Sequence, residues 1–177
     1  MNRIWKMSLL IVIIIIVDQL TKGAIQTSFQ LGESKTIIDG FFNFTYVQNP
    51  GAAFGFMATA SAPVRKVLFL FLPVLACIWL CWLIWTTRKT NFLLCLAYSL
   101  IFAGAVGNLI DRFSMGYVVD FLDFYLGSSH FPAFNVADSS ITIAAFLLII
   151  DLINESYYKI KKEKAANEEA SVLDQKE

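Results

Sequence analysis

Three carboxylates lie in a part of the sequence that is otherwise mostly aromatic and aliphatic. The stretch YVVDFLDFYLGSSHFPAFNVADSSITIAAFLLII, residues 117–150, contains Asp120, Asp123 and Asp138. Two carboxylates brought together in a medium of low dielectric constant cannot both ionise readily, so one of them keeps a proton near neutral pH. Such a pair can act as general base and general acid together. Acid–base chemistry is therefore the first hypothesis for this segment.

Charged residues also occur at helical spacing inside an apolar run near the N-terminus. Asp18 and Lys22 are four residues apart, so they share one face of a helix and can form an ion pair. Two interpretations remain open. The pair only lowers the cost of inserting both charges into a membrane, or it belongs to a functional site.

A further face combines small and polar residues. Gly104, Gly107, Asn108 and Asp111 recur at i, i+3, i+4 and i+7 of a helix. Close packing of helices is a sufficient explanation for the glycines. Packing alone does not explain Asn108, or Arg112 beside this face.

Asp138 has a structural alternative to a chemical role, because Asp and Asn are favoured at helix N-termini. Either Asn135 or Asp138 could bind the free amides at the start of the last apolar segment. One cap does not need both residues, so a second role for Asp138 stays open.

The composition indicates a membrane protein. Hydrophobic residues make up 57% of the 177 residues and charged residues 16%, against about 45–50% and about 25% in soluble domains. The 14 basic and 14 acidic residues cancel, so no basic field favours nucleic acid as a partner. The three cysteines lie in apolar runs, far in sequence from the single histidine, which argues against a disulfide framework or a Cys/His zinc site.

The apolar segments predict the fold class: an all-α integral membrane protein with four transmembrane helices and a small extracytoplasmic β-rich loop region. About 20 apolar residues are needed to cross a bilayer. The predicted helices lie at about residues 7–25, 67–85, 92–110 and 137–157, and the predicted outer loops at 26–66 and 111–136. These elements form one domain, residues 1–158, followed by a polar cytoplasmic tail, residues 159–177, which we expect to be disordered from about residue 163.

The orientation follows from basic residues that flank the helices, since cytoplasmic segments carry an excess of Lys and Arg. They lie before the first helix, between the second and third, and after the fourth: Arg3, Lys6, Arg88, Lys89, Lys159, Lys161, Lys162 and Lys164. Both termini are therefore predicted to be cytoplasmic. The polar residues of interest then fall at or near the outer surface, where the sequence TIIDGFFNFTYVQNPGAAFGF in the first loop predicts a hairpin or small sheet.

Two hypotheses compete with an enzyme at this surface. A proton-coupled carrier would also contain membrane carboxylates, but carriers usually show internal repeats and binding residues at the midplane, and this sequence shows neither. A structural membrane subunit is favoured only by the small size of the chain and its glycine seam.

Five motifs in order resemble those of the lipoprotein signal peptidase family, also called signal peptidase II. They are DQLTK at 18–22, NPGAAFGF at 49–56, GAVGNLIDR at 104–112, VVDF at 118–121 and FNVADSSI at 134–141. The resemblance implies a membrane aspartic endopeptidase that removes the signal peptide from diacylglyceryl-modified bacterial prolipoproteins, cleaving before the lipidated cysteine. It also implies a multi-pass protein of the bacterial inner (plasma) membrane with its active site at the outer surface.

The motifs carry family roles to residues of this chain. Asp120 and Asp138 match the catalytic dyad, whereas Asp123 does not. The residues that match the substrate site are Asn49, Gly51, Asn108, Arg112 and Asn135, and the supporting residues are Asp18, Lys22 and Asp111. The resemblance implies no metal or organic cofactor. The expected partners are diacylglyceryl-prolipoprotein substrates and membrane lipids, with the chain active as a monomer and no nucleic acid bound.

Overall fold

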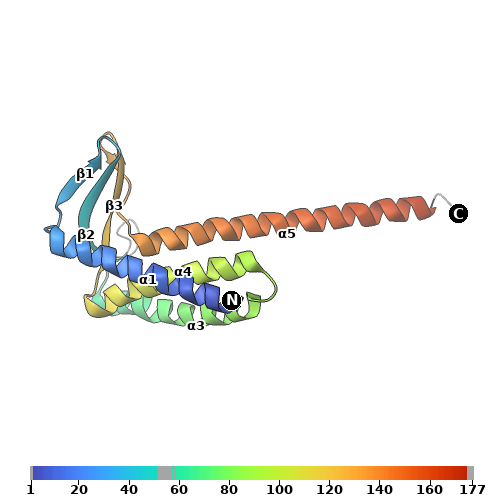
Figure 1. Cartoon of the computed structure of the whole chain (residues 1–177), viewed down its shortest axis with the longest axis horizontal. Helices are drawn as coiled ribbons and strands as arrows, with labels where there is room; N and C mark the ends of the chain where they lie inside the picture. Colours follow the sequence, from blue (N-terminus) through green and yellow to red (C-terminus); the bar gives the residue numbers. More distant parts are fainter. Residues whose placement is uncertain (1, 52–56, 58, 175–177) are drawn as a thin grey trace.

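The computed structural model describes residues 2–51, 57 and 59–174 of the chain. Within these residues four helices are long and apolar enough to cross a bilayer, as the sequence predicts: Arg3–Ser28, Pro63–Thr87, Phe92–Ser114 and Val136–Lys164. They lie side by side with a small antiparallel sheet at one end (Figure 1). The predicted fold class is confirmed.

The helices extend beyond the predicted ranges. α1 spans Arg3–Ser28, α4 spans Phe92–Ser114 and α5 spans Val136–Asp174, and the second crossing comprises α2 (Ala62–Lys66), a π-helical turn η2 (Val67–Phe71) and α3 (Leu72–Thr87). Because α4 continues to Ser114, Asp111 lies on a helix and not in the outer loop to which the sequence assigned it.

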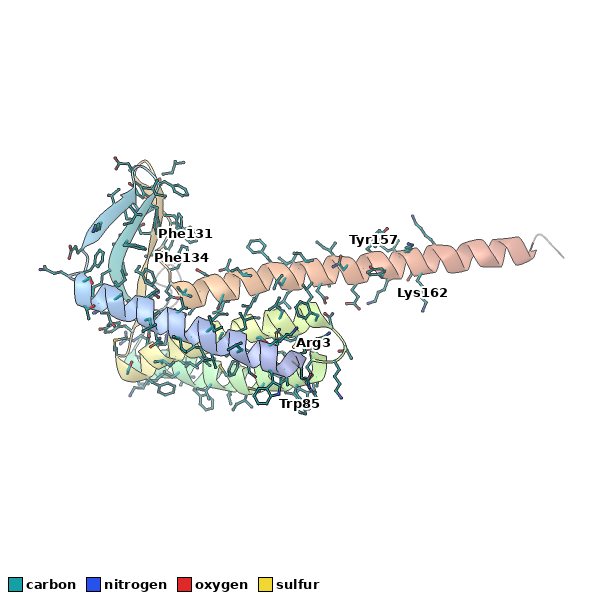
Figure 2. All side chains as sticks on the ribbon, in the orientation of Figure 1. Arg3, Trp85, Phe131, Phe134, Tyr157 and Lys162 are labelled. Carbon is teal, nitrogen blue, oxygen red and sulfur yellow. The ribbon has the colours of Figure 1, made fainter. Side chains whose placement is uncertain are left out.

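The C-terminal segment differs from the expected disordered tail, because α5 continues as a helix to Asp174. Its sequence after Tyr157 is rich in Lys, Glu and Ala, which favour helix. An i,i+4 ion pair between Lys159 Nζ and Glu155 Oε1, at 2.7 Å, adds the small local contribution that such pairs make on exposed helices. This part of α5 projects past the ends of the other helices, with Tyr157 and Lys162 away from the bundle (Figure 2).

The sheet has the strand order β1-β2-β3-β4. The strands are β1 (Ser34–Ile38), β2 (Phe42–Asn49), β3 (Val118–Leu126) and β4 (Ser129–His130). β1 and β2 form the predicted hairpin, and Gly40 in its turn has φ +74°, a conformation that residues with a Cβ rarely adopt. β3 pairs antiparallel with β2, with Val47 opposite Asp120. The sheet therefore joins the two segments that the sequence predicts to be outer loops.

α4 is the central helix of the bundle. Half of its most apolar stretch is buried, against 17% for each of the other three spanning helices. It contacts α1, α3 and α5. Gly104 and Gly107 permit the close approach, because a Cβ built on Gly107 would lie 2.6 Å from Asp18 Oδ2 and 3.2 Å from Ala137 Cβ. The predicted glycine seam therefore packs against both α1 and the start of α5.

Candidate active site

A buried ion network holds the C-terminal half of α1 against α4. Lys22 Nζ lies 2.8 Å from Asp18 Oδ2 and 2.9 Å from Asp111 Oδ2, and all three side chains are almost fully buried. The same ammonium group donates a 2.9 Å hydrogen bond to Asn108 Oδ1. Burying charges is tolerable when each is paired and hydrogen-bonded, and this network meets that condition.

The two carboxylates of this network also hold the elements that carry the dyad candidates. Asp18 Oδ1 accepts a 2.8 Å hydrogen bond from the backbone N–H of Ala137, at the start of α5. Asp111 Oδ2 accepts one of 3.1 Å from the backbone N–H of Val119, on β3. The ion network therefore positions the two segments that present Asp138 and Asp120.

Gln19 belongs to the same network, although sequence reasoning gave it no role of its own. Its Nε2 donates to Asp111 Oδ1 at 2.9 Å and to the carbonyl of Gly107 at 3.2 Å. The signal in the sequence is a polar side chain next to Asp18 in an otherwise apolar helix. Its partners are about ninety positions away, so spacing does not reveal them.

Asn135 and Asp138 cap α5 reciprocally. The backbone N–H of Asp138 donates to Asn135 Oδ1 at 2.9 Å, and the backbone N–H of Asn135 donates to Asp138 Oδ2 at 3.3 Å. This arrangement is a capping box. Both residues thus take part in the cap, and Asp138 still has its second oxygen, Oδ1, directed at another partner.

Two asparagines connect the carboxylates of Asp120 and Asp138. Asn108 Nδ2 donates to Asp138 Oδ1 at 2.8 Å, and Asn135 Nδ2 donates to Asp120 Oδ1 at 2.8 Å. Asn135 Nδ2 also lies 3.2 Å from Asn108 Oδ1, so the two carboxamides contact each other. Because Lys22 donates to Asn108 Oδ1, the amide nitrogen of Asn108 is the atom that faces Asp138.

The environment of Asp120 favours its protonated form. Burial, followed by the charge of Asp138, raises its pKa from 3.8 to about 7, against the opposing effect of hydrogen bonds from Asn49 and Asn135. The Asn49 bond joins Nδ2 to Asp120 Oδ2 at 3.0 Å. A carboxyl group with a pKa near 7 can hold or release a proton at neutral pH.

Arg112 reaches the same region from the end of α4. Its Nη2 donates a 2.9 Å hydrogen bond to the carbonyl of Gly51, whose own N–H donates to Asn49 Oδ1 at 3.0 Å. The guanidinium carbon lies 5.4 Å from the centre of the Phe69 ring, on η2. Residues 49–51 are the part of the second motif that the structure describes, because residues 52–56 lie outside the described residues.

These side chains border one cavity of about 510 Å³. Its polar side is formed by Asn49, Asn108, Arg112, Asp120 and Asp138. Its apolar side is formed mainly by residues 131–134 and by Ile141 and Ile143 of α5. Phe131 and Phe134 lie at the sheet end of the bundle, opposite the end marked by Arg3 and Trp85 (Figure 2).

The structure thus brings the sequence-predicted residues together in two groups. Asp120, Asp138, Asn49, Asn108 and Arg112 line the cavity, with Asn135 and Gly51 bonded to members of this group. Asp18, Lys22 and Asp111 form the ion network behind it. Asp123 is separate from both, because residues three apart on a strand face opposite sides of the sheet.

A bundle of spanning helices with two linked carboxylates beside an apolar cavity is the architecture of a membrane aspartic hydrolase. Comparison with known proteins agrees. Residues 10–154 match the family model described as Signal peptidase (SPase) II. The chain belongs to the signal peptidase II family, a family of aspartic peptidases.

Individual relatives cover most of the chain. The lipoprotein signal peptidase of Desulforapulum autotrophicum is 51% identical over 148 residues, which are 84% of this chain and 91% of the relative. That of Syntrophus aciditrophicus is 41% identical over 147 residues, 83% and 91% of the two chains. The solved structure of a bacterial membrane enzyme superposes with a TM-score of 0.76 at 39% identity, covering 86% of this chain and 90% of the other. These matches do not favour the carrier or structural-subunit hypotheses.

Proposed function

We propose that Asp120 and Asp138 are the catalytic dyad of a peptidase that removes the signal peptide from diacylglyceryl-modified prolipoproteins, cleaving before the lipidated cysteine. The observation that carries this proposal is the pair of carboxylates joined through Asn108 and Asn135 at one cavity of a signal peptidase II family member. Peptide hydrolysis needs one ionised and one protonated carboxyl group, and such a pair supplies both.

In the proposed reaction the ionised carboxylate takes a proton from a water molecule, whose oxygen attacks the scissile carbonyl carbon. The protonated carboxyl gives its proton to the leaving amide nitrogen as the tetrahedral intermediate collapses. The products are a new carboxyl terminus on the signal peptide and a free amine on the lipidated cysteine. After one cycle the proton taken from water replaces the proton that was given.

Arg112 is the proposed donor to the carbonyl oxygen of the substrate. Its Nε is buried and has no hydrogen-bond partner in the described part of the chain, while its Nη2 is held by Gly51. A donor held in place before the reaction stabilises negative charge that develops in the transition state. We do not assign this role to Asn108 or Asn135, because their side-chain amides already donate hydrogen bonds to Asp138 and Asp120.

The apolar side of the cavity is consistent with a substrate that carries acyl chains. Residues 131–134 and the first turns of α5 present apolar side chains next to the dyad. Burial of acyl chains contributes about 0.8 kcal/mol per methylene. We further propose that the cavity opens at the outer surface of the bacterial inner membrane, that both termini are cytoplasmic, and that the chain acts as a monomer among membrane lipids.

The test is incubation of the purified protein with a prolipoprotein, with and without its diacylglycerol group, followed by mass analysis. We expect cleavage immediately before the lipidated cysteine and slow cleavage of the unmodified chain. Asp120→Asn and Asp138→Asn should each reduce turnover to near background, and the double variant should be scarcely slower, since residues that act as one unit are not additive.

Asp151→Asn is the matched control. Asp151 accepts a 2.8 Å hydrogen bond from Asn91 at the far end of the bundle, and its Oδ1 position is kept by Asn. This variant should cleave at the wild-type rate. If Asp138→Asn also did so, Asp138 would be only a helix cap and the dyad mechanism would be wrong.

A further inference from the structure

A third carboxylate on β3 is buried, although the proposed reaction does not use it. Asp123 is 6% exposed. Its Oδ1 lies 2.8 Å from Nδ1 of His130 on β4. Its Oδ2 accepts hydrogen bonds from two residues of β2, at 2.9 Å from Thr45 Oγ1 and at 3.3 Å from Asn43 Nδ2. One side chain of β3 therefore binds both neighbouring strands.

The hydrogen bonds determine which group carries the proton. Burial by itself raises the pKa of Asp123, but the hydrogen bonds from His130, Thr45 and Asn43 outweigh it, and the pKa is lowered from its ordinary value. Asp123 is thus ionised at neutral pH, and an ionised carboxylate only accepts hydrogen bonds. Nδ1 of His130 must therefore be the protonated, donating nitrogen.

The His130 ring has a second contact that fixes its plane. It stacks on Tyr125 with ring centres 5.0 Å apart and an interplanar angle of 11°. Tyr125 Oη in turn accepts a 2.9 Å hydrogen bond from the backbone N–H of Gly40, in the turn between β1 and β2. The half-exposed His130 side chain is therefore held by two residues of β3, and one of them, Tyr125, is itself bonded to the turn between β1 and β2.

The segment that follows His130 forms a wall of the cavity. Residues 131–134 border it, and Asn135 begins the cap of α5 immediately afterwards. β4 has only two residues, and hairpins this short are not stable alone. Two backbone hydrogen bonds to β3 hold the ends of this wall. The N–H of Phe131 donates to the carbonyl of Phe124 at 2.8 Å, and the N–H of Phe134 donates to the carbonyl of Leu122 at 3.1 Å.

We propose that the Asp123–His130 pair is a positioning device for the cavity wall, residues 131–134, and so sets the affinity for the apolar part of the substrate without entering the bond-breaking step. This inference rests on the proposed function, because the wall borders the cavity that contains the proposed dyad. His130 and Asp123 are positioning residues, since they act through the wall.

The variants separate the hydrogen bond from the ring contact. His130→Phe keeps an aromatic ring for Tyr125 but removes the donor to Asp123. His130→Asn places an amide nitrogen near the position of Nδ1 and keeps the donor. Asp39→Asn is the control, because it removes an exposed carboxylate from the turn between β1 and β2, and no bond of that carboxylate to Asp123 or His130 is seen among the described residues.

Two measurements are made on each purified variant: steady-state cleavage of diacylglyceryl-prolipoprotein, and amide hydrogen exchange of residues 129–135 in the absence of substrate. For His130→Phe we expect KM to rise roughly tenfold, the scale of one charge-assisted hydrogen bond, with kcat within about twofold of wild type and faster exchange at Phe131. His130→Asn should restore both values, and Asp39→Asn should match wild type.

Unchanged KM and unchanged exchange in His130→Phe would overturn the positioning role. An equal fall in kcat and kcat/KM with unchanged exchange would also overturn it, because that pattern places the pair in the chemical step. If the wild-type protein did not cleave the lipidated substrate, the proposed function would fail. Hydrogen exchange in the same variants would then decide separately whether the pair holds the wall.

Discussion

Asp120 and Asp123 show how neighbouring residues of one strand acquire different acidities. Both are buried on β3, at 2% and 6% exposure. Asp120 faces the carboxylate of Asp138, and its pKa rises to about 7 because burial and this like charge outweigh its hydrogen bonds. Asp123 has three donors and no such neighbour among its named partners, so its pKa is lowered despite burial. Residue type alone does not assign the chemistry.

The pH dependence of cleavage should reflect Asp120. Its pKa of about 7 lies above the ordinary 3.8, so the folded protein holds this proton more tightly than an unfolded chain does. The proposed dyad loses its proton as the pH rises through about 7, and the rate constant for cleavage should fall on that side. We expect the fall in single-turnover measurements between pH 6 and about 9, in membranes or detergent.

The raised pKa of Asp120 also makes the stability of the folded protein decrease with rising pH. Wild-type protein should lose stability relative to Asp120→Asn as the pH rises from about 4 to about 7, because ionising this buried carboxylate is unfavourable. The thermal midpoint of the wild-type protein should therefore fall relative to that of the variant as the pH rises over this range. A cleavage rate constant that does not change up to about pH 9, together with thermal midpoints that change in parallel, would contradict the proposed role of Asp120.

At the scale of elements, the seam between α4 and α5 determines where Asp138 lies. A Cβ on Gly104 would lie 2.6 Å from Ser140 Oγ and 2.7 Å from Ile141 Cγ1, and it would also meet the backbone carbonyl of Ala137. Contacts this short force α5 to move, because a backbone atom cannot turn aside as a side chain does. The movement carries Asp138 away from Asn108.

We therefore predict that Gly104→Ala lowers stability by about 1–3 kcal/mol and reduces kcat, as measured by thermal unfolding and by cleavage of lipidated substrate. Gly23→Ala on α1 is the matched control, since a Cβ added there would meet nothing within 4 Å. It should retain wild-type activity. Equal behaviour of the two variants would show that the α4–α5 approach tolerates a methyl group.

The elements differed in how far the sequence predicted them. Runs of apolar residues predicted the four spanning helices, because crossing a bilayer requires length and hydrophobicity that a single segment displays. The β1–β2 hairpin was also predicted from its Asp39-Gly40 turn. β3 was not, although VVDFLDFYL is rich in β-branched and aromatic residues, because its partner strand is about seventy residues away.

For the candidate site, the sequence predicted which residues belong to it but not how they contact one another. Motif resemblance selected the carboxylates and amides that the structure brings to one cavity. Their bonding was not accessible to sequence reasoning: the reciprocal cap of Asn135 and Asp138 replaces the expected choice between them. Gln19 and His130 were not selected, because their contacts depend on how distant segments meet in space.

At the scale of the whole molecule, polar chemistry is concentrated at one end of the bundle. The sheet lies there, while α5 alone extends past the opposite end (Figure 1). The cavity borders β3 and the start of α5, and the ion network bonds to the same two elements. At that opposite end the basic residues Arg3, Lys6, Arg88 and Lys89 cluster around the helix termini. Segments rich in Lys and Arg next to membrane helices usually lie in the cytoplasm. The position of these residues therefore favours a candidate site on the outer side of the membrane.

The last prediction tests this orientation by labelling single cysteines with a membrane-impermeant thiol reagent in whole cells. The natural cysteines Cys77, Cys81 and Cys95 are first replaced by Ser or Ala, and one cysteine is then introduced at Phe41, Ser128, Lys89 or Lys164. The residues at all four positions are exposed, so access depends on the side of the membrane. Positions 41 and 128 should react in intact cells, whereas 89 and 164 should react only after the membrane is permeabilised.

Permeabilised cells are the control, because every introduced cysteine should react in them. If position 128 reacted only after permeabilisation, the cavity would face the cytoplasm, and the proposed substrate, which presents its lipidated cysteine on the outer side, could not reach Asp120 and Asp138.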